Sequence, residues 1–365
     1  MISRNEKLYR EAIKMKENFN LNNLLRDNIR NIKPYSSARD EYKDITDGML
    51  FIDANENPFN TNVNRYPDPQ QVKLKKLLAE LKGVSEKNVL LGNGSDEVLD
   101  LIFRAFCEPN RDKIITLPPT YGMYSVLANI NAVDNIEIQL ESNFQPNTNA
   151  ILEAANSQTK LLFLCSPNNP TANSFEANKI ETLLNKFEGI VVIDEAYIDF
   201  SKEESWLNRL QDFPNLIVTQ TLSKAYGLAG IRLGICYASE AIISVLNKIK
   251  PPYNINQLTQ DKASQRLNNM ETIKKEVNTI LSERELLAKK LEDISLVEKV
   301  YLSDANFLLV KVDDANKRYA ELVEKGIVVR NRTTQALCDN CLRFTVGTEI
   351  ENEKLIEILR LISKS

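Results

Sequence analysis

The stretch that decides the fold is Thr219-Gln-Thr-Leu-Ser-Lys-Ala-Tyr-Gly-Leu-Ala-Gly-Ile-Arg-Leu-Gly234. The apolar run 216–218 leads into it and predicts a short buried strand that breaks into small polar residues before Lys224. A lysine just past a strand end can be desolvated, which lowers its pKa so that the free amine attacks a carbonyl. Ser223 and Arg232 offer a hydroxyl and a fork of donors, the groups that bind phosphate. The stretch therefore indicates either a site for an aldehyde that carries a phosphate, of which pyridoxal phosphate is the common one, or a surface lysine beside a glycine turn.

The residues around this stretch predict strands that alternate with helices. Buried strands are predicted over 160–165, 189–193 and 216–219, with a helix over 175–187 between the first two. Such alternation implies a parallel sheet with right-handed crossovers, and ligands bind at the carboxyl ends of its strands. Polar residues follow each predicted end, which makes them candidates for one shared site: Asn169, Asp194, Tyr197 and Lys224.

Three further loops could contribute to the same site. The glycine turn 92–97 opens a predicted helix at Ser95 and Asp96, and it is either an anion site or an ordinary capped helix. Tyr121 follows two prolines at another strand exit, where its ring could stack on a flat ligand or simply pack in the loop. Tyr66 lies in a loop that prolines stiffen, so its side chain could project in a fixed direction.

Length and pattern predict two domains preceded by an arm. At 365 residues the chain exceeds one small core. We expect an N-terminal arm over 1–57, a large domain over 58–255, and a linker helix with a small α+β domain over 256–365. A long amphipathic helix over 271–293 is predicted to bridge the two domains.

The N-terminal arm is predicted to contain a helix, an irregular segment over 31–49 and a short strand. Apolar positions at helical spacing predict a helix over 1–30, and 50–52 is predicted as a short strand. Charged residues of both signs, with no apolar core, exclude a secretory signal at the start.

Arg330 and Arg343 each lie in a predicted apolar strand of the small domain, over 327–330 and 342–346 respectively. An arginine in such a place needs an anionic partner, because desolvation is otherwise costly. The partner is either a structural carboxylate or a substrate anion.

Composition excludes several classes of protein. The chain has no histidine, which rules out Ser-His-Asp and Cys-His catalysis and zinc sites built on histidine. The net charge of -4 argues against nucleic acid as a partner, and no apolar run reaches the ~18 residues of a membrane span.

The cysteines predict a reducing compartment and no metal site. Their number, five, is odd, and they are scattered, which favours the cytoplasm. Cys338 and Cys341 form half of a possible zinc site, but the other cysteines supply no second pair.

Taken together, these residues resemble the fold-type-I pyridoxal-phosphate-dependent aminotransferases, and most closely the histidinol-phosphate aminotransferase family. The resemblance covers nearly the whole chain from about Phe19. It implies an α/β fold with a mostly parallel sheet between helices in the large domain, beside a smaller α+β domain. The motifs that carry it occur in the family's order: Asn28-Ile-Arg-Asn-Ile-Lys-Pro-Tyr35, Ala54-Asn-Glu-Asn-Pro58, Arg65-Tyr-Pro-Asp68, Gly94-Ser-Asp-Glu97, Ser166-Pro-Asn-Asn-Pro-Thr171, Ile193-Asp-Glu-Ala-Tyr197, Ser223-Lys-Ala-Tyr-Gly-Leu-Ala-Gly-Ile-Arg232 and Cys341-Leu-Arg-Phe-Thr-Val-Gly347.

The resemblance also implies roles for individual residues. Lys224 would hold the cofactor covalently and move a proton at the substrate Cα, and Asp194 would pair with the ring nitrogen. Tyr66 would reach the cofactor phosphate from the second subunit of a homodimer. The cofactor-binding set is Ser95, Asp96, Tyr121, Asn169, Asp194, Tyr197, Ser223, Lys224, Arg232 and Tyr66, and the substrate-binding set is Tyr35, Asn55, Arg330 and Arg343.

The activity implied is transfer of an amino group between glutamate or 2-oxoglutarate and imidazole-acetol phosphate or histidinol phosphate, in histidine biosynthesis. Three alternatives on the same scaffold stay open. They are an aminotransferase for aromatic or other amino acids, a decarboxylase for a phosphorylated amino acid, and a pyridoxal-binding sensor without catalysis.

Overall fold

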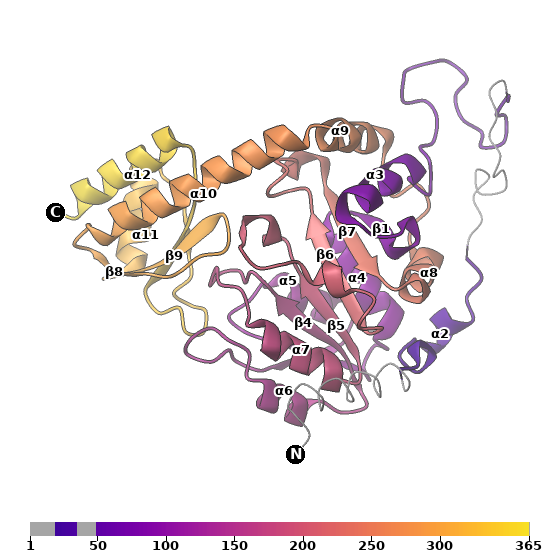
Figure 1. Ribbon diagram of the computed structural model, residues 1–365, viewed down its shortest axis with the longest axis horizontal. Helices are drawn as coiled ribbons and strands as arrows, with labels where there is room; N and C mark the ends of the chain where they lie inside the picture. The colour runs from indigo at the N-terminus through magenta and orange to yellow at the C-terminus, as the bar shows by residue number, and fades with distance from the viewer. Residues whose placement is uncertain (1–18, 35–48, 365) are drawn as a thin grey trace.

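The computed structural model describes residues 19–34 and 49–364, which form two sheets with helices packed against them (Figure 1). The larger sheet has seven strands in the order β1-β7-β6-β5-β4-β2-β3. Their bounds are β1 Val89–Asn93, β2 Lys113–Thr116, β3 Asp134–Glu137, β4 Thr159–Cys165, β5 Ile190–Asp194, β6 Leu216–Thr221 and β7 Leu233–Ala238.

Five neighbouring strands of this sheet are parallel. β3, β2, β4, β5 and β6 pair in parallel, whereas β7 is antiparallel to both β6 and β1. The parallel register brings Cys165 of β4 opposite Asp194 of β5, and Asp194 opposite Thr219 of β6. The ends of three successive strands therefore meet at one edge, as the sequence predicts.

Alternating side chains of the sheet enter two separate hydrophobic cores. Leu161 and Phe163 of β4 pack in one core, and Leu162 and Leu164 pack in the other. This is why β4 is a continuous apolar run: it is buried on both faces. The helices of the larger unit are α3 Val72–Lys82, α4 Ser95–Phe106, α5 Met123–Ile130, α6 Thr148–Ala154, α7 Ala177–Lys186, α8 Glu240–Ile249 and α9 Gln257–Leu267.

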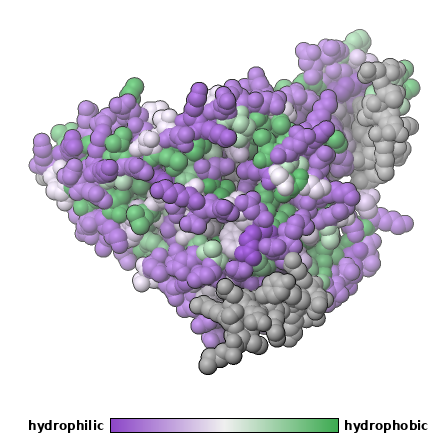
Figure 2. All heavy atoms as spheres, viewed as in Figure 1, coloured by the Kyte–Doolittle hydropathy of each residue, from purple (hydrophilic) through white to green (hydrophobic). Residues whose placement is uncertain are grey.

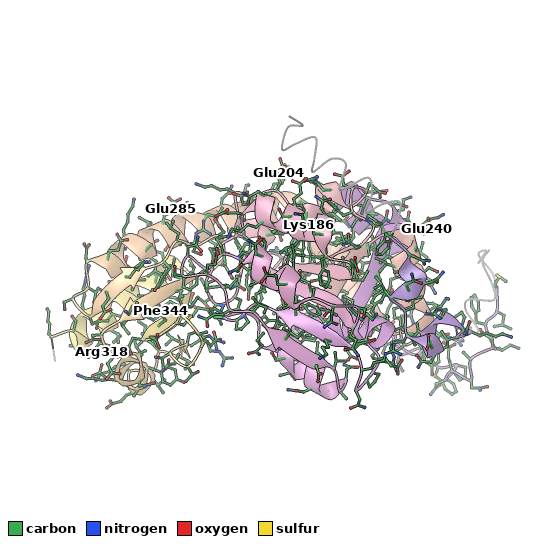
Figure 3. All side chains as sticks on the ribbon, turned by 90° about the horizontal axis from the view of Figure 1, so that it is seen from below. Lys186, Glu204, Glu240, Glu285, Arg318 and Phe344 are labelled. Carbon is green, nitrogen blue, oxygen red and sulfur yellow. The ribbon has the colours of Figure 1, made fainter. Side chains whose placement is uncertain are left out.

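The smaller unit is a four-stranded antiparallel sheet in the order β10-β11-β9-β8, joined to the larger unit by the long helix α10 (Figure 1). The smaller unit has its own hydrophobic core, separate from the two around the larger sheet, and this core includes Phe344 of β11. Figure 3 labels Phe344 and also Arg318 of α11. The elements are α10 Met270–Glu292, β8 Val297–Val300, β9 Phe307–Val312, α11 Ala315–Glu324, β10 Arg330–Asn331, β11 Cys341–Thr345 and α12 Glu349–Ile362.

The long helix confirms the predicted bridge over 271–293, but two local predictions are wrong. Residues 50–52 are not a strand: Leu50 is 80% exposed and Ile52 85% exposed, so neither of these two side chains is buried in a core of the described residues. The strand predicted at 327–330 begins only at Arg330, because Ile327 donates its N–H to Leu322 and completes the end of α11 instead.

The predicted helix over 1–30 is tested only beyond residue 18, since residues 1–18 and 35–48 lie outside the described part. Within 19–34 there is a 3-10 turn, Leu21–Asn23, and a short helix α2, Asp27–Arg30. The domain boundaries at 57 and 255 stay a prediction.

Within residues 19–34 and 49–364, no helix combines the length and apolar character needed to cross a membrane. The same residues contain no group of three or more Cys, Asp or Glu side chains placed to hold a metal ion.

Candidate active site

A cavity of about 110 Å³ opens where strands β4, β5 and β6 end. Every predicted cofactor ligand except Tyr66 lines it, together with three residues that the sequence did not single out, Cys165, Ala196 and Thr221. The residues brought together are Ser95, Asp96, Tyr121, Asn169, Asp194, Tyr197, Ser223, Lys224 and Arg232. They span more than 130 positions of sequence, so the parallel sheet is what assembles them.

Lys224 lies on the turn that follows β6. The turn closes because Gly227 donates its N–H to the Lys224 carbonyl at 3.0 Å, and Gly227 adopts a φ of +68°, which glycine tolerates best. The Lys224 amine opens into the cavity, 5.4 Å from the ring centroid of Tyr197. Displaced water and the charge of Arg343 lower the pKa of Lys224, although Asp194 acts in the opposite direction. The amine is thus more available as a nucleophile and a base than that of an ordinary lysine.

Asp194 ends β5 as a nearly fully buried carboxyl group. Tyr124 donates its hydroxyl to Asp194 Oδ2 at 2.8 Å, and the N–H of Ala196 donates to Oδ1 at 3.2 Å. Burial raises the pKa of Asp194, and these two hydrogen bonds act against that rise. The ion pairs of the described residues do not include Asp194, so a cation bound in the cavity would find an unopposed carboxylate here.

The other end of the cavity is built on the N-terminus of α4. This helix has no side-chain cap, so its first N–H groups remain available to an anion. Gly94 has a φ of +84°, which strains residues with a side chain, and a Cβ added there would lie 2.7 Å from an Arg232 guanidinium nitrogen and would displace it. Ser223 is fixed by Thr221, whose hydroxyl donates to Ser223 Oγ at 2.9 Å.

Tyrosine and asparagine side chains form the remaining walls. Tyr121 donates its hydroxyl to Asp96 Oδ1 at 3.1 Å, and its ring packs edge-on against Tyr124 at 5.5 Å between centroids. Asn169 Oδ1 accepts a hydrogen bond from Arg343 of β11. This hydrogen bond therefore connects the four-stranded sheet to the loop that follows β4 of the seven-stranded sheet, at the cavity.

The donor set fits an aldehyde that carries a phosphate and a basic ring nitrogen. An amine of lowered pKa suits the aldehyde, and a helix N-terminus with Arg232 and Ser223 suits the phosphate. The buried carboxylate of Asp194 suits a protonated ring nitrogen. The residues are thus compatible with the pyridoxal phosphate expected from the sequence.

The two predicted arginines face each other on the small sheet. Arg330 of β10 is directly opposite Arg343 of β11, and both line a neighbouring hollow of about 650 Å³. The Arg343 guanidinium also lies 5.0 Å from the ring centroid of Phe307, and burial lowers its pKa. Arg343 thus connects this hollow to the cavity at Asn169.

Two predicted residues lie elsewhere, and a third is not described. Tyr66 and Asn55 line a separate hollow of about 380 Å³ on the projecting N-terminal segment, where the Tyr66 ring stacks on Tyr253 at 4.5 Å. Tyr35 lies outside the described residues. The structure of one chain therefore does not bring Tyr66 or Asn55 to the cavity.

Sequence reasoning missed two residues that bear on the site. Tyr124 holds Asp194, but in the sequence it is one apolar position of an ordinary amphipathic helix. Arg332 interacts electrostatically with Tyr197 and Arg330, and the only signal was its position two residues after Arg330. The direction in which either side chain points cannot be predicted from the local spacing of residues in the sequence.

The fold and this cavity define an aminotransferase. The model of the aminotransferase class I and II family matches residues 18–359. Two solved histidinol-phosphate aminotransferases share the fold at 23% identity: that of Clostridium acetobutylicum has a TM-score of 0.77 over 83% of this chain and 92% of that one. That of Sinorhizobium meliloti, solved in complex with pyridoxal-5'-phosphate, has a TM-score of 0.76 over 83% of this chain and 84% of that one.

Sequence similarity is much higher among curated relatives. The histidinol-phosphate aminotransferase of Flavobacterium johnsoniae is 63% identical over 346 residues, which are 94% of this chain and 99% of the relative. The chain belongs to the histidinol-phosphate aminotransferase family.

Proposed function

We propose that this protein uses pyridoxal 5'-phosphate to transfer an amino group from glutamate to imidazole-acetol phosphate, giving 2-oxoglutarate and histidinol phosphate in histidine biosynthesis. The observation that carries the proposal is the single cavity in which Lys224 meets Asp194 and the α4 N-terminus. Identity of 63% to the Flavobacterium johnsoniae relative supports the choice of substrate.

Each wall of the cavity has a distinct task in this reaction. Bound pyridoxal phosphate supplies an aldehyde and an electron-withdrawing ring. Asp194 stabilises positive charge on the ring nitrogen, and Tyr124 keeps that carboxylate in place. Ser223, Arg232 and the N–H groups of α4 hold the phosphate, while Tyr121 stacks on the ring and Asn169 and Tyr197 bind its phenolic oxygen.

Lys224 is the base that moves a proton at the substrate Cα. Its lowered pKa places more of the amine in the unprotonated form near neutral pH, which suits a general base. The charge of Arg343, on the small sheet, contributes to the lowered pKa of Lys224. In this proposal the small sheet therefore affects the general base in addition to binding the substrate.

Arg330 and Arg343, together with Asn55 and with Tyr35 of the N-terminal arm, bind the anionic groups of the substrates in this proposal. The hollow that the two arginines line adjoins the cavity through Asn169. A guanidinium is suited to both carboxylate and phosphate, so one place can serve glutamate and the phosphorylated substrate in turn.

The active form in this proposal is a homodimer in which Tyr66 of one chain reaches the cofactor phosphate of the other. Tyr66 is 51% exposed, and it stacks on Tyr253 instead of entering its own cavity. Figure 2 shows apolar atoms, in green, on the projecting segment at the upper right, and a second copy could cover them. The exposed apolar residues of that segment are Met49, Leu50, Ile52, Phe59 and Val63.

We place the enzyme in the cytoplasm. All five cysteines are free and buried, which is typical of a protein that folds in a reducing compartment.

Two measurements test the proposal. The first is reduction of the purified protein with borohydride, digestion and mapping of the tagged peptide, which should contain Lys224. The second compares turnover of histidinol phosphate, phenylalanine and threonine phosphate side by side with 2-oxoglutarate. Histidinol phosphate should have the highest kcat/KM.

The alternatives correspond to defined outcomes. Preference for phenylalanine would indicate an aromatic aminotransferase, and release of carbon dioxide from threonine phosphate would indicate a decarboxylase. A cofactor absorption band that does not change on addition of glutamate would indicate a sensor without catalysis.

A further inference from the structure

A third arginine, Arg332, lies on the same face of the small sheet as Arg330 and Arg343. Arg332 donates its N–H to the carbonyl of Cys341 at 2.8 Å, which continues the pairing of β10 with β11 by one more step. Side chains of a strand alternate, and directly opposed residues of an antiparallel pair share a face. Since Arg330 is opposite Arg343, Arg332 two residues further on shares their face.

The opposite face of the same strand is occupied differently. Asn331, between the two arginines, donates its amide to Asn316 of α11 at 2.8 Å. The α11 face thus receives a neutral side chain in an ordinary structural contact. The charged side chains are all directed to the other face.

The three guanidinium groups repel each other. Arg332 and Arg330 both contribute to the lowered pKa of Arg343, and Arg330 contributes to the lowered pKa of Arg332, in each case after burial. In the described part of the chain, the ion pairs include none of these three arginines. The Nε atoms of Arg332 and Arg343 are buried and lack a hydrogen-bond partner there.

Such an arrangement costs folding free energy. Like charges in partly buried positions are unfavourable, and each unsatisfied buried donor adds its own desolvation cost. Both Arg332 and Arg343 interact with Tyr197, which lines the cavity of Lys224. The positive potential is therefore directed at the place where substrate anions would bind, and an anion there would relieve the repulsion.

We propose that Arg332 is a specificity residue of the anion subsite, and that its added positive charge favours substrate groups with two negative charges over groups with one. The inference rests on the proposed function and extends it to a residue outside the family motifs. Arg332 acts through its charge at Coulomb range, beside Arg330 and Arg343. Coulomb energy scales with the charge of the ligand. If removing Arg332 raises the dissociation constant of a monoanion by a given factor, it should raise that of a dianion by about the square of that factor.

The test uses full-length, cofactor-loaded Lys224→Ala protein, in which ligands bind without turnover. Calorimetry gives dissociation constants for histidinol phosphate, histidinol, glutamate and inorganic phosphate. The variants are Arg332→Gln, which removes the charge, Arg332→Lys, which keeps it, and Arg360→Gln as a control on the exposed face of α12. Thermal unfolding of each variant checks that it is folded.

The expected pattern depends on ligand charge. In Arg332→Gln the dissociation constant should rise roughly 25- to 100-fold for histidinol phosphate and roughly 5- to 10-fold for glutamate, with no change for histidinol. Arg332→Lys should restore most of the loss, and Arg360→Gln should match the parent protein.

A pH series separates charge from structure. A phosphate monoester loses its second proton near a pH of about 6, so the effect of Arg332→Gln on histidinol phosphate should shrink below that pH. Apart from Lys224, which the test protein lacks, the charged and titratable groups that interact with Arg332 or its two neighbours are Arg330, Arg343, Tyr197 and Cys338. Tyr197 and Cys338 keep their charge state near that pH, because burial raises the pKa of Tyr197 and raises that of Cys338 to about 12.

Two outcomes would overturn the inference: equal losses for histidinol and histidinol phosphate, or an unchanged histidinol phosphate affinity in Arg332→Gln. Failure of the proposed function has a different signature, because the protein with Lys224 intact would not turn over histidinol phosphate. In that case glutamate and inorganic phosphate still decide the inference, since both should bind more weakly to Arg332→Gln.

Discussion

The two sheets contribute to the site in opposite ways. At the edge of the seven-stranded sheet, polar side chains are bonded to one another: Tyr124 donates to Asp194, Tyr121 donates to Asp96, and Thr221 donates to Ser223. On the four-stranded sheet, three arginines share one face, and the carboxylates of the described residues leave them unpaired.

This difference is what a site with a resident cofactor and an exchanging substrate requires. Internal hydrogen bonds hold the cavity walls in one geometry, so a bound group meets them without reorganisation. Unpaired cations gain the most from an anion that arrives, and they release it when its charge or shape changes. We call the edge of the seven-stranded sheet with these hydrogen bonds the paired edge, and the face of the four-stranded sheet with Arg330, Arg332 and Arg343 the arginine face. The comparison predicts that substitutions at the paired edge change the rate of the reaction. Substitutions at the arginine face should change which substrate binds.

Lys224→Ala should have the largest effect, because Lys224 is the group on the paired edge that we propose reacts. Loss of its proton transfer alone should lower turnover by roughly 10²- to 10⁴-fold, and the fold should be retained because the amine opens into a cavity. Single-turnover kinetics with glutamate and circular dichroism measure both. The control is Lys289→Ala on the exposed side of α10, and full activity in Lys224→Ala would refute the assignment.

Asp194→Asn should have the next largest effect. Its neutral amide cannot stabilise a ring cation, so kcat should fall on the order of 10²- to 10³-fold, with little change in KM. Tyr124→Phe is the matched variant, since it keeps the carboxylate and removes only the hydrogen bond at 2.8 Å. Its loss should be smaller, and a larger loss in Tyr124→Phe than in Asp194→Asn would contradict the role given to the carboxylate.

Arg330→Ala should change substrate preference with little effect on the chemistry. Loss of one charged hydrogen bond to phosphate costs about 1.5–3 kcal/mol, which is roughly a 10- to 100-fold rise in KM for histidinol phosphate. The expected effect on glutamate is much smaller. Parallel KM measurements decide the matter, and equal losses for the two substrates would remove the contrast between the sheets.

The smallest expected effect is a shift in the titration of Lys224 in Arg343→Gln, measured without substrate so that the part of Arg343 in substrate binding does not enter. The charge of Arg343 helps lower the pKa of Lys224, so removing that charge raises this pKa. A lysine below its pKa carries a proton and cannot attack, so less free amine is present at any given pH. The pH profile for borohydride trapping of pyridoxal phosphate on cofactor-free protein should therefore move to higher pH. An unchanged profile would show that the charge of Arg343 does not influence the amine.

Most of the paired edge was predictable from the sequence. Strands β4, β5 and β6 are continuous apolar runs that end in polar residues, so their carboxyl ends and the residues there follow from local pattern. The same reasoning failed at 50–52, where three consecutive apolar residues predict a strand but Leu50 and Ile52 are mostly exposed. It also failed at 327–328, where the backbone closes a helix instead of extending a strand.

The arginine face was only partly predictable. Arg330 and Arg343 were recognisable as charged residues in apolar segments, but their direct opposition and the alignment of Arg332 depend on the register between β10 and β11. Tyr124 likewise became a partner of Asp194 only when α5 packed against the sheet.

The sequence by itself determined the class of fold, the family and the lysine proposed to react, because hydrophobic period and contiguous motifs are local properties of the chain. Tertiary structure alone decided which charged side chains face one another. It also decided which side chains of the site are hydrogen-bonded to each other and which remain available to bind a ligand. These depend on strand register and on contacts between segments far apart in sequence, and on burial, which sets the pKa of each group only after the chain has closed around it.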